Sequence, residues 1–290
     1  MSSLNLFRFL LRSDSVHNLD RVLVKVNVGY FVNSYKRFSS ESKHRKRFYK
    51  DVSVINSDDL YEICLDGKRI KTPFNKLVQV KSQQLALMVA NEWKCQLDTI
   101  KSYEMHLTNL TNCAIDNPEN HTKETLANSI LEFLATDTIC FRLREPVDLY
   151  KLQITRWDPM IDWLSTRYNC QVPLTEDVFL PPIPPVTQST LHRHLLSYNQ
   201  WSLHGIYSIT ESLKSVILTL ALIDKKISVN EAVSLSRLEL EYQTSIWGNV
   251  EWAHTIELMM TRARVSAALL FVFTNSESFK SITKSKTSSY

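Results

Sequence analysis

Glycine is scarce in this 290-residue chain, which has four, at positions 29, 67, 205 and 248. Four isolated glycines cannot form a G-x-G-x-x-G dinucleotide turn, a Walker-type phosphate loop or the G-x-S-x-G elbow of a hydrolase. The five cysteines contain no C-x-x-C pair and their number is odd, so neither a disulfide framework nor a thiolate zinc site is indicated. Nucleotide binding by these routes is excluded, and we expect no cofactor.

Long apolar runs and an excess of positive charge are also missing. The longest apolar run, residues 216–223, is interrupted by Thr219 and is far shorter than the roughly 20 residues that span a bilayer. The net charge is +4, but the first forty residues hold six Lys and Arg against two Asp, which leaves 28 basic and 28 acidic residues in the remainder. Phosphate binding needs clustered Lys and Arg, so we expect neither membrane insertion nor a nucleic-acid partner.

The first 44 residues have the composition of a mitochondrial transit peptide. Basic residues such as Arg8 and Arg12 are spaced among Leu and Phe, and Asp14 and Asp20 are the only acids in the first forty residues. This Arg-rich, acid-poor pattern is typical of import into mitochondria. An ordinary disordered N-terminus is the alternative.

Residues 45–145 are predicted to form a small α+β domain. A period of two between residues 48 and 80 indicates short antiparallel strands, and Asp66-Gly67 is the signal of a type I′ hairpin turn. Ser82 is placed to cap a helix that follows. Two more helices are expected, over residues 103–115 and from near Pro118, and a β-leaning piece over residues 138–143 closes the domain.

Residues 146–275 are predicted to form an all-α helical domain, followed by a frayed tail over residues 276–290. Four prolines make residues 180–186 an extended connection rather than a helix. Long helices are expected over residues 201–223, 230–246 and 251–273. The stretch 213–223 is apolar nearly all round, which indicates the buried centre of a bundle.

Glu251 and His254 form an E-x-x-H spacing that could place two metal ligands on one side of a helix. Di-iron bundle proteins need two such motifs facing inward, and this chain has one. At about 100° per residue, the apolar face of this helix consists of Trp252, Ile256, Met259, Ala263 and Leu270. Glu251 and His254 fall outside that face, so we predict a solvated polar surface and no metal.

Glu239 is a more informative acid. On the predicted helix 230–246 it lies inside an apolar stripe formed by Ala232, Leu235, Leu238, Tyr242 and Ile246. Since burying an unpaired charge is prohibitive, two interpretations stay open. Glu239 forms an ion pair with Arg262 or Arg264 of the next helix, or it lines a cleft that receives a partner. Glu241 points to the side and is expected to be solvated.

Trp247 is the exception among six tryptophans that mostly recur on apolar faces. It precedes Gly248 and Asn249 in the predicted turn between the last two helices. Turn aromatics often make binding contacts, and packing across the helix ends is the equal alternative.

The chain contains two long and unusual motifs, LSRLELEYQTSIWGNVEWAHTIE at 235–257 and NEWKCQLDTIKSYEMHLTNL at 91–110. These motifs resemble those of the mitochondrial ATP synthase assembly factor 2 family, the chaperones of the alpha subunit of the enzyme's catalytic head. Shorter family-like motifs occur in family order: RFYKDVSV at 47–54, LDGKRIKTP at 65–73, DTICFR at 137–142, WDPMIDW at 157–163, YNQWSLHGI at 198–206 and KSVILTLALID at 214–224. The resemblance covers roughly residues 45–275.

The resemblance implies a two-domain chaperone of the mitochondrial matrix without enzymatic chemistry. Such a protein would bind unassembled alpha subunit and shield its beta-contacting surface until beta arrives. The family's acidic cluster falls on Glu239 and Glu241, with Leu240 where a third acid is expected. The candidate partner-binding residues are therefore Glu239, Glu241 and Trp247. A carboxylate-metal helical enzyme and a stable structural subunit of a mitochondrial complex are the alternative functions.

Overall fold

The computed structural model describes residues 45–276. The chain divides into two compact units, and the described part of the first consists of residues 45–47 and 98–100, which pair through Lys46 and Thr99. The second unit holds residues 48–97 and the described chain from residue 101 onward. The predicted leader and most of the predicted tail lie outside the described residues, and the domain boundary at residues 145 and 146 stays a prediction.

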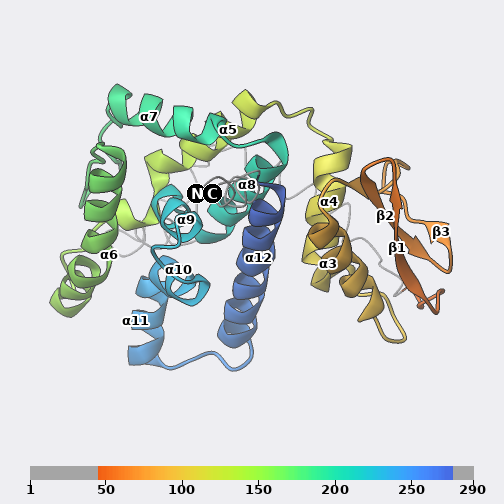
Figure 1. Cartoon of the computed structure of the whole chain (residues 1–290). Helices are drawn as coiled ribbons and strands as arrows, with labels where there is room; N and C mark the ends of the chain where they lie inside the picture. The colour runs from red at the N-terminus through yellow and green to blue at the C-terminus, as the bar shows by residue number, and fades with distance from the viewer. Residues whose placement is uncertain (1–44, 277–290) are drawn as a thin grey trace, which may run out of the picture. The chain divides into compact units, whose positions relative to one another are not determined.

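The second unit begins with a four-stranded antiparallel sheet, as the period of two predicted (Figure 1). The second strand is central, because it pairs with each of the other three. The strands are β1 (Val52–Ser57), β2 (Leu60–Leu65), β3 (Lys68–Arg69) and β4 (Gln79–Val80).

Both tight hairpins turn through residues with positive φ. Asp66 (φ 49°) and Gly67 (φ 76°) join β2 to β3, so the predicted type I′ turn is confirmed. The Asp66 carboxylate also accepts a hydrogen bond from the Asp51 amide at 2.8 Å. The turn between β1 and β2 passes through Asp58 (φ 51°) and Asp59 (φ 63°), and the absence of glycine concealed it in the sequence.

The helix α3 (Gln83–Lys94) packs against β1 and β2. Its first turn is capped as predicted, because the Leu85 amide donates to Ser82 Oγ at 3.3 Å. Leu85 and Val89 lie on its buried face. This helix, the first in the described part of the chain, is therefore specified locally by its cap and its apolar period.

The next helix, α4 (His106–Asp116), is capped by a residue distant in sequence. Its own N-cap, Met105, has no side-chain oxygen to offer the first amides. The Glu92 carboxylate of α3 accepts instead from the Leu107 amide at 2.8 Å and from the Thr108 amide at 2.7 Å. Burial raises the pKa of Glu92, and these hydrogen bonds oppose the rise.

The remainder of the described chain is helical apart from its connections, which confirms the α+β fold class (Figure 1). Three short 3₁₀ helices span Ser102–Glu104, Phe133–Thr136 and Thr138–Cys140. The α-helices are α5 (Lys123–Glu132), α6 (Val147–Tyr168), α7 (Pro185–Leu196), α8 (Gln200–Leu213), α9 (Val216–Ile223), α10 (Val229–Ser236), α11 (Leu238–Trp247) and α12 (Ala253–Asn275).

The core of the helical part is built around α9. All eight of its residues are buried, as its composition predicted, and it packs against α6, α8 and α10. The longest contact runs between α8 and α12, where Gly205 lets the two helices approach closely (Figure 1). A Cβ at Gly205 would lie 2.7 Å from Val272 Cγ2.

The single helix predicted over residues 201–223 is wrong, because the chain breaks between α8 and α9. Lys214 has φ 55°, and Ser215 starts a new helix by accepting from the Leu218 amide at 3.1 Å. The buried Asp137 carboxylate also accepts from the Val216 amide at 2.8 Å. A local cap and a distant one therefore make the break favourable.

Two other expectations need correction. Residues 138–143 are not a strand: a 3₁₀ helix is followed by Phe141, which makes one isolated bridge to Thr175. The connection 180–186 is extended as far as Pro184, but Pro185 begins α7, because proline suits the first helical position.

Candidate partner-binding surface

The helix α11 carries all three sequence-predicted candidates but does not present them on one surface. Glu239 is buried, with 3% of its surface exposed, whereas Trp247 is 74% exposed. Glu241 is exposed and accepts a hydrogen bond from Ser234 Oγ of α10 at 2.9 Å. A docking protein could reach Trp247 and Glu241 directly. Direct contact with Glu239 stays a prediction, and it would require movement of α11.

The predicted helix 230–246 is two helices, α10 and α11, separated at Arg237 (φ −110°, ψ 11°). Arg237 caps neither helix with its side chain but pairs through Nη1 with Glu257 of α12 at 3.0 Å. Glu239 and Glu241 therefore occupy the first turn of a helix without a side-chain cap. Acids in that position are stabilised by the unpaired amides and the helix dipole.

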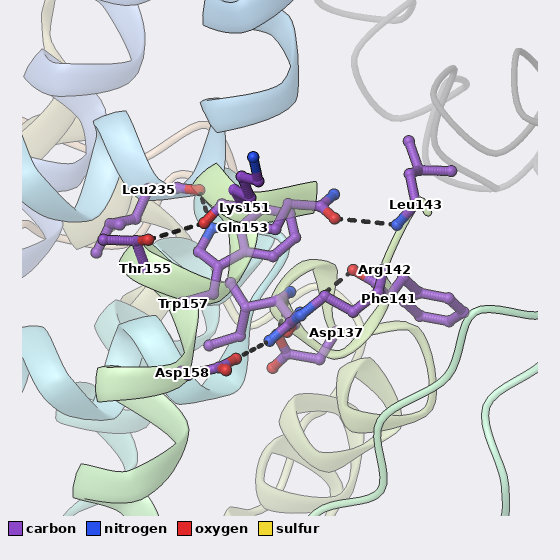
Figure 2. Close-up of polar contacts among 11 residues, drawn as sticks. Asp137, Phe141, Arg142, Leu143, Lys151, Gln153, Thr155, Trp157, Asp158 and Leu235 are labelled. Atoms are coloured by element: carbon purple, nitrogen blue, oxygen red, sulfur yellow. Dashed lines mark hydrogen bonds and ion pairs between the residues drawn. The ribbon is translucent and has the colours of Figure 1, made fainter. Parts of the chain in front are cut away.

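Glu239 is held by a glutamine of α6. Gln153 Nε2 donates to Glu239 Oε1 at 2.7 Å, and Gln153 is itself fully buried. The other end of the amide is also occupied, because Gln153 Oε1 accepts from the Leu143 amide at 3.0 Å (Figure 2). The ion pair of Glu239 with Arg262 or Arg264 stays a prediction.

Further polar contacts fix α6 in the same region (Figure 2). Trp157 Nε1 donates to the Leu235 carbonyl of α10 at 2.9 Å. The guanidinium of Arg142 lies 5.1 Å from the centroid of the Trp157 ring, and its Nη2 pairs with Asp158 at 2.7 Å. These hydrogen-bonded groups set the position of α6 against α10 and α11.

An apolar surface covers the end of α11, the following turn and the start of α12. Each of its side chains is at least half exposed, and Trp252 is 74% exposed like Trp247. We call this set the α11–α12 apolar surface; it consists of Ile246, Trp247, Val250, Trp252, Ile256 and Met259. A concentration of exposed large apolar groups, two of them tryptophans, is typical of a protein-binding site.

The apolar face predicted for the helix over residues 251–273 is exposed rather than buried in the core. Ala263 on that face is exposed, as are its other members, whereas Val265, Ala268 and Val272 are buried. At about 100° per residue, the buried residues lie roughly half a turn away. The C-terminal half of α12 packs on α8, so the apolar face of its N-terminal half is left in solvent.

The turn between α11 and α12 is held by polar contacts of His254. Its Nδ1 lies 2.7 Å from Asn249 Oδ1 and 3.3 Å from the Val250 amide. Gly248 (φ 86°) and Trp252 (φ 69°) have positive φ at the two ends of this turn. Positive φ is costly for a tryptophan, so the turn holds the Trp252 ring outward at some cost in backbone strain.

The residues of this region do not form a metal centre. Glu251 is exposed, as predicted. His254 was predicted to be solvated but is half-buried, because its side chain contacts the turn. Between residues 45 and 276, no three His, Cys, Asp or Glu side chains are grouped to bind a metal ion. Over the same range, no helix has the length and apolarity required to cross a bilayer.

A hollow of about 250 Å³ lies between α11 and α12 beside the apolar surface. Seven of the nine residues that line it are polar, among them Arg237, Glu241, Asn249 and His254. Exposed apolar groups next to hydrogen-bonding groups match the composition of protein interfaces, which have an apolar centre and a polar rim. The arrangement is suited to binding rather than to catalysis.

Sequence reasoning found Trp247 but not the rest of this surface. Trp252, Ile256 and Met259 belong to the predicted apolar face of residues 251–273 and Ile246 to the predicted stripe of residues 230–246, whereas Val250 has no such pattern. The available signal was a second apolar face farther along the same helix, at Val265 and beyond. A single core can cover only one of two opposed apolar faces of a helix, so the other face is left exposed.

Comparisons with known proteins match this chain to chaperones. A family model described as the ATP12 chaperone protein matches residues 46–165. A curated relative from Schizosaccharomyces pombe, named Protein atp12, mitochondrial, is 27% identical, and the match covers 73% of this chain and 77% of the relative. Protein ATP12, mitochondrial, from Saccharomyces cerevisiae is 23% identical, with coverage of 80% and 85%.

A solved structure supports the same fold. The crystal structure of Atp12 from Paracoccus denitrificans superimposes with a TM-score of 0.71 at 27% identity. The match covers 80% of this chain and 98% of the bacterial one. The sheet and the helical part therefore recur together in a relative of similar extent.

Proposed function

The chain belongs to the ATP12 chaperone family, and from this premise we propose that it binds the unassembled alpha subunit of the mitochondrial ATP synthase. The family is one of chaperones and not of enzymes. In the proposed function, the chain shields the surface of alpha that later contacts beta. The compartment we propose is the mitochondrial matrix, and the names of both yeast relatives support a mitochondrial location.

The α11–α12 apolar surface is the observation that carries this proposal. A subunit waiting for its partner exposes apolar surface that would otherwise aggregate, and a chaperone needs a matching surface to cover it. Trp247 and Trp252 are both largely exposed, and tryptophans supply a large share of the binding energy in protein interfaces. Glu241 lines the hollow between α11 and α12.

Release requires no nucleotide in this proposal. Beta displaces the chaperone because both compete for the same surface of alpha, and the more favourable complex prevails by mass action. In the free chain, Glu239 holds α11 against α6 through its hydrogen bond with Gln153. Trp247 at the far end of the same helix makes the contact.

The test is suppression of alpha aggregation by the purified chain. Trp247→Ala and Trp252→Ala are each expected to weaken alpha binding by roughly 30-fold, the effect of losing about 2 kcal/mol at an interface hot spot. Phe179→Ala is the matched control, because Phe179 is 80% exposed but lies in the connection before α7. Full protection of alpha by the folded double tryptophan variant would show that the surface is assigned wrongly.

A second experiment separates a chaperone from a structural subunit. In mitochondria depleted of the beta subunit, a chaperone is expected to accumulate in a complex with free alpha. A structural subunit would instead copurify with the assembled ATP synthase at a fixed ratio. Recovery with the assembled enzyme and never with free alpha would contradict the proposal.

A further inference from the structure

The helix α11 is thinly packed compared with its neighbours. Two of its ten residues, Leu238 and Glu239, are buried, whereas all eight residues of α9 are buried. Its main packing partners are α6 and α10. Because helices in proteins gain most of their stability from packing, an element with so little buried surface opens at a low free-energy cost.

Both ends of α11 are breaks in regular structure. Arg237 (φ −110°, ψ 11°) separates it from α10, and Gly248 (φ 86°, ψ 165°) ends it. Residues at the ends of elements absorb the backbone rotations of hinge motions. The helix can therefore turn about these two residues while α10 and α12 stay in place.

A buried hydrogen bond links this helix to α6. Gln153 donates to Glu239 at 2.7 Å, and the Leu143 amide holds the Gln153 side chain in position from the other side. While α11 is closed, loss of Glu239 removes the acceptor of Gln153 Nε2 in the interior. Once α11 opens, water reaches both groups and replaces this hydrogen bond, which reduces the cost of opening.

We propose that α11 is a hinged flap that leaves α6 when alpha docks, so that Leu238 and Glu239 join the α11–α12 apolar surface. This inference rests on the proposed function. Leu238 would extend the apolar contact. The freed Glu239 carboxylate would accept hydrogen bonds from a Lys or Arg at the border of the apolar patch of alpha. The apparent affinity for alpha then depends on the fraction of molecules in which the flap is open.

The decisive variant is Gln153→Glu. The substitution keeps an acceptor for the Leu143 amide but places a second carboxylate against Glu239. Repulsion between the two carboxylates therefore weakens the contact between α6 and α11. We expect hydrogen exchange of residues 239–247 to rise by about 10- to 100-fold while α9 keeps its protection. The apparent Kd for purified alpha is expected to fall by up to the same factor.

A second variant guards against misfolding of the first. Glu239→Ala loosens the same contact without placing a charge in the interior, so α11 is expected to open. It lacks the carboxylate that alpha would bind, so its gain in affinity should be smaller than that of Gln153→Glu. Thr155→Ala is the control on α6, because Thr155 is exposed and bonds only to the Lys151 carbonyl of its own helix (Figure 2).

Hydrogen exchange of α11 tests the hinge, and the affinity for alpha tests the extension of the surface, so the two parts of the proposal can fail separately. Unchanged exchange of α11 in both flap variants would overturn the hinge, whatever the binding result. Faster exchange of α11 with unchanged or weaker binding of alpha by Gln153→Glu would overturn the extension of the surface. Failure of the unsubstituted chain to bind alpha would overturn the proposed function and with it the role of the flap, while the exchange data would still report the hinge.

Discussion

Replacing Gly205 with alanine is expected to destabilise the protein, although alanine is the better helix former. Gly205 lies inside α8, where Gly→Ala normally gains about 0.5–1 kcal/mol. The new Cβ would lie 2.7 Å from Val272 Cγ2 and 3.2 Å from the Ala268 carbonyl oxygen. Val272 is fully buried and β-branched, so it cannot rotate away cheaply.

Overpacking of a tight core contact costs about 1–3 kcal/mol, which exceeds the gain in helix propensity. We therefore expect Gly205→Ala to lower the free energy of unfolding by about 1–2 kcal/mol, and the Tm by about 2–4 °C for each kcal/mol. Equilibrium urea unfolding, followed by tryptophan fluorescence and circular dichroism, measures the change. The midpoint should fall while the slope stays constant.

A double-mutant cycle isolates the contact. In a Val272→Ala background the clashing methyl group is gone, so Gly205→Ala should become neutral or stabilising by up to about 1 kcal/mol. The coupling free energy would then be about 1–3 kcal/mol. If Gly205→Ala stabilises the unsubstituted protein, or if the two changes are additive, then the packing of α8 on α12 is not the constraint inferred.

Three further predictions concern buried polar groups. Glu92→Ala should lower the free energy of unfolding by about 1–3 kcal/mol, because it strips the Thr108 and Leu107 amides of their acceptor; a loss below about 0.5 kcal/mol in urea would contradict the distant cap. The Asp137 carboxylate accepts hydrogen bonds from the Val216 and Ile217 amides at the start of α9. Asp137→Ala should therefore lower the free energy of unfolding by a similar amount and raise hydrogen exchange at the start of α9. Unchanged exchange there would contradict the capping role of Asp137. Burial and nearby His121 lower the pKa of His204 from 6.5 to about 4, so the native state binds fewer protons than the unfolded state between these values. The contribution of His204 to stability should fall by about 3 kcal/mol as the pH drops from 6.5 to 4, and His204→Gln should remove that part of the pH profile.

Local sequence signals were sufficient to predict several features in which a residue and its partner are close in sequence. Ser82 caps α3, and Asp66-Gly67 turns the second hairpin because φ is positive there. The composition of residues 216–223 was enough to place α9 in the core. Each of these features depends on backbone geometry or on burial of a uniformly apolar segment, and both are written in a few consecutive residues.

The breaks in the long helical patterns could not be seen in the same way. The start of α9 depends on Asp137, and the start of α4 depends on Glu92 of another helix. Sequence periodicity continues through Lys214 and Arg237, although the chain leaves the helix there. Glu92 and Asp137 come from elsewhere in the fold, so the tertiary structure determines the start of α4 and adds to the local Ser215 cap at the start of α9.

The candidate site also combines features that the sequence predicted with features that only the structure shows. The sequence identified α11 through Glu239, Glu241 and Trp247, because an acid in an apolar stripe and a tryptophan in a turn are conspicuous. It could not tell that Glu239 is buried against Gln153 and that the apolar face beginning at Trp252 is exposed. Which of two apolar faces of a helix is covered depends on where its neighbour packs. For α12 that neighbour is α8, so the tertiary structure alone decides that its predicted apolar face is left exposed.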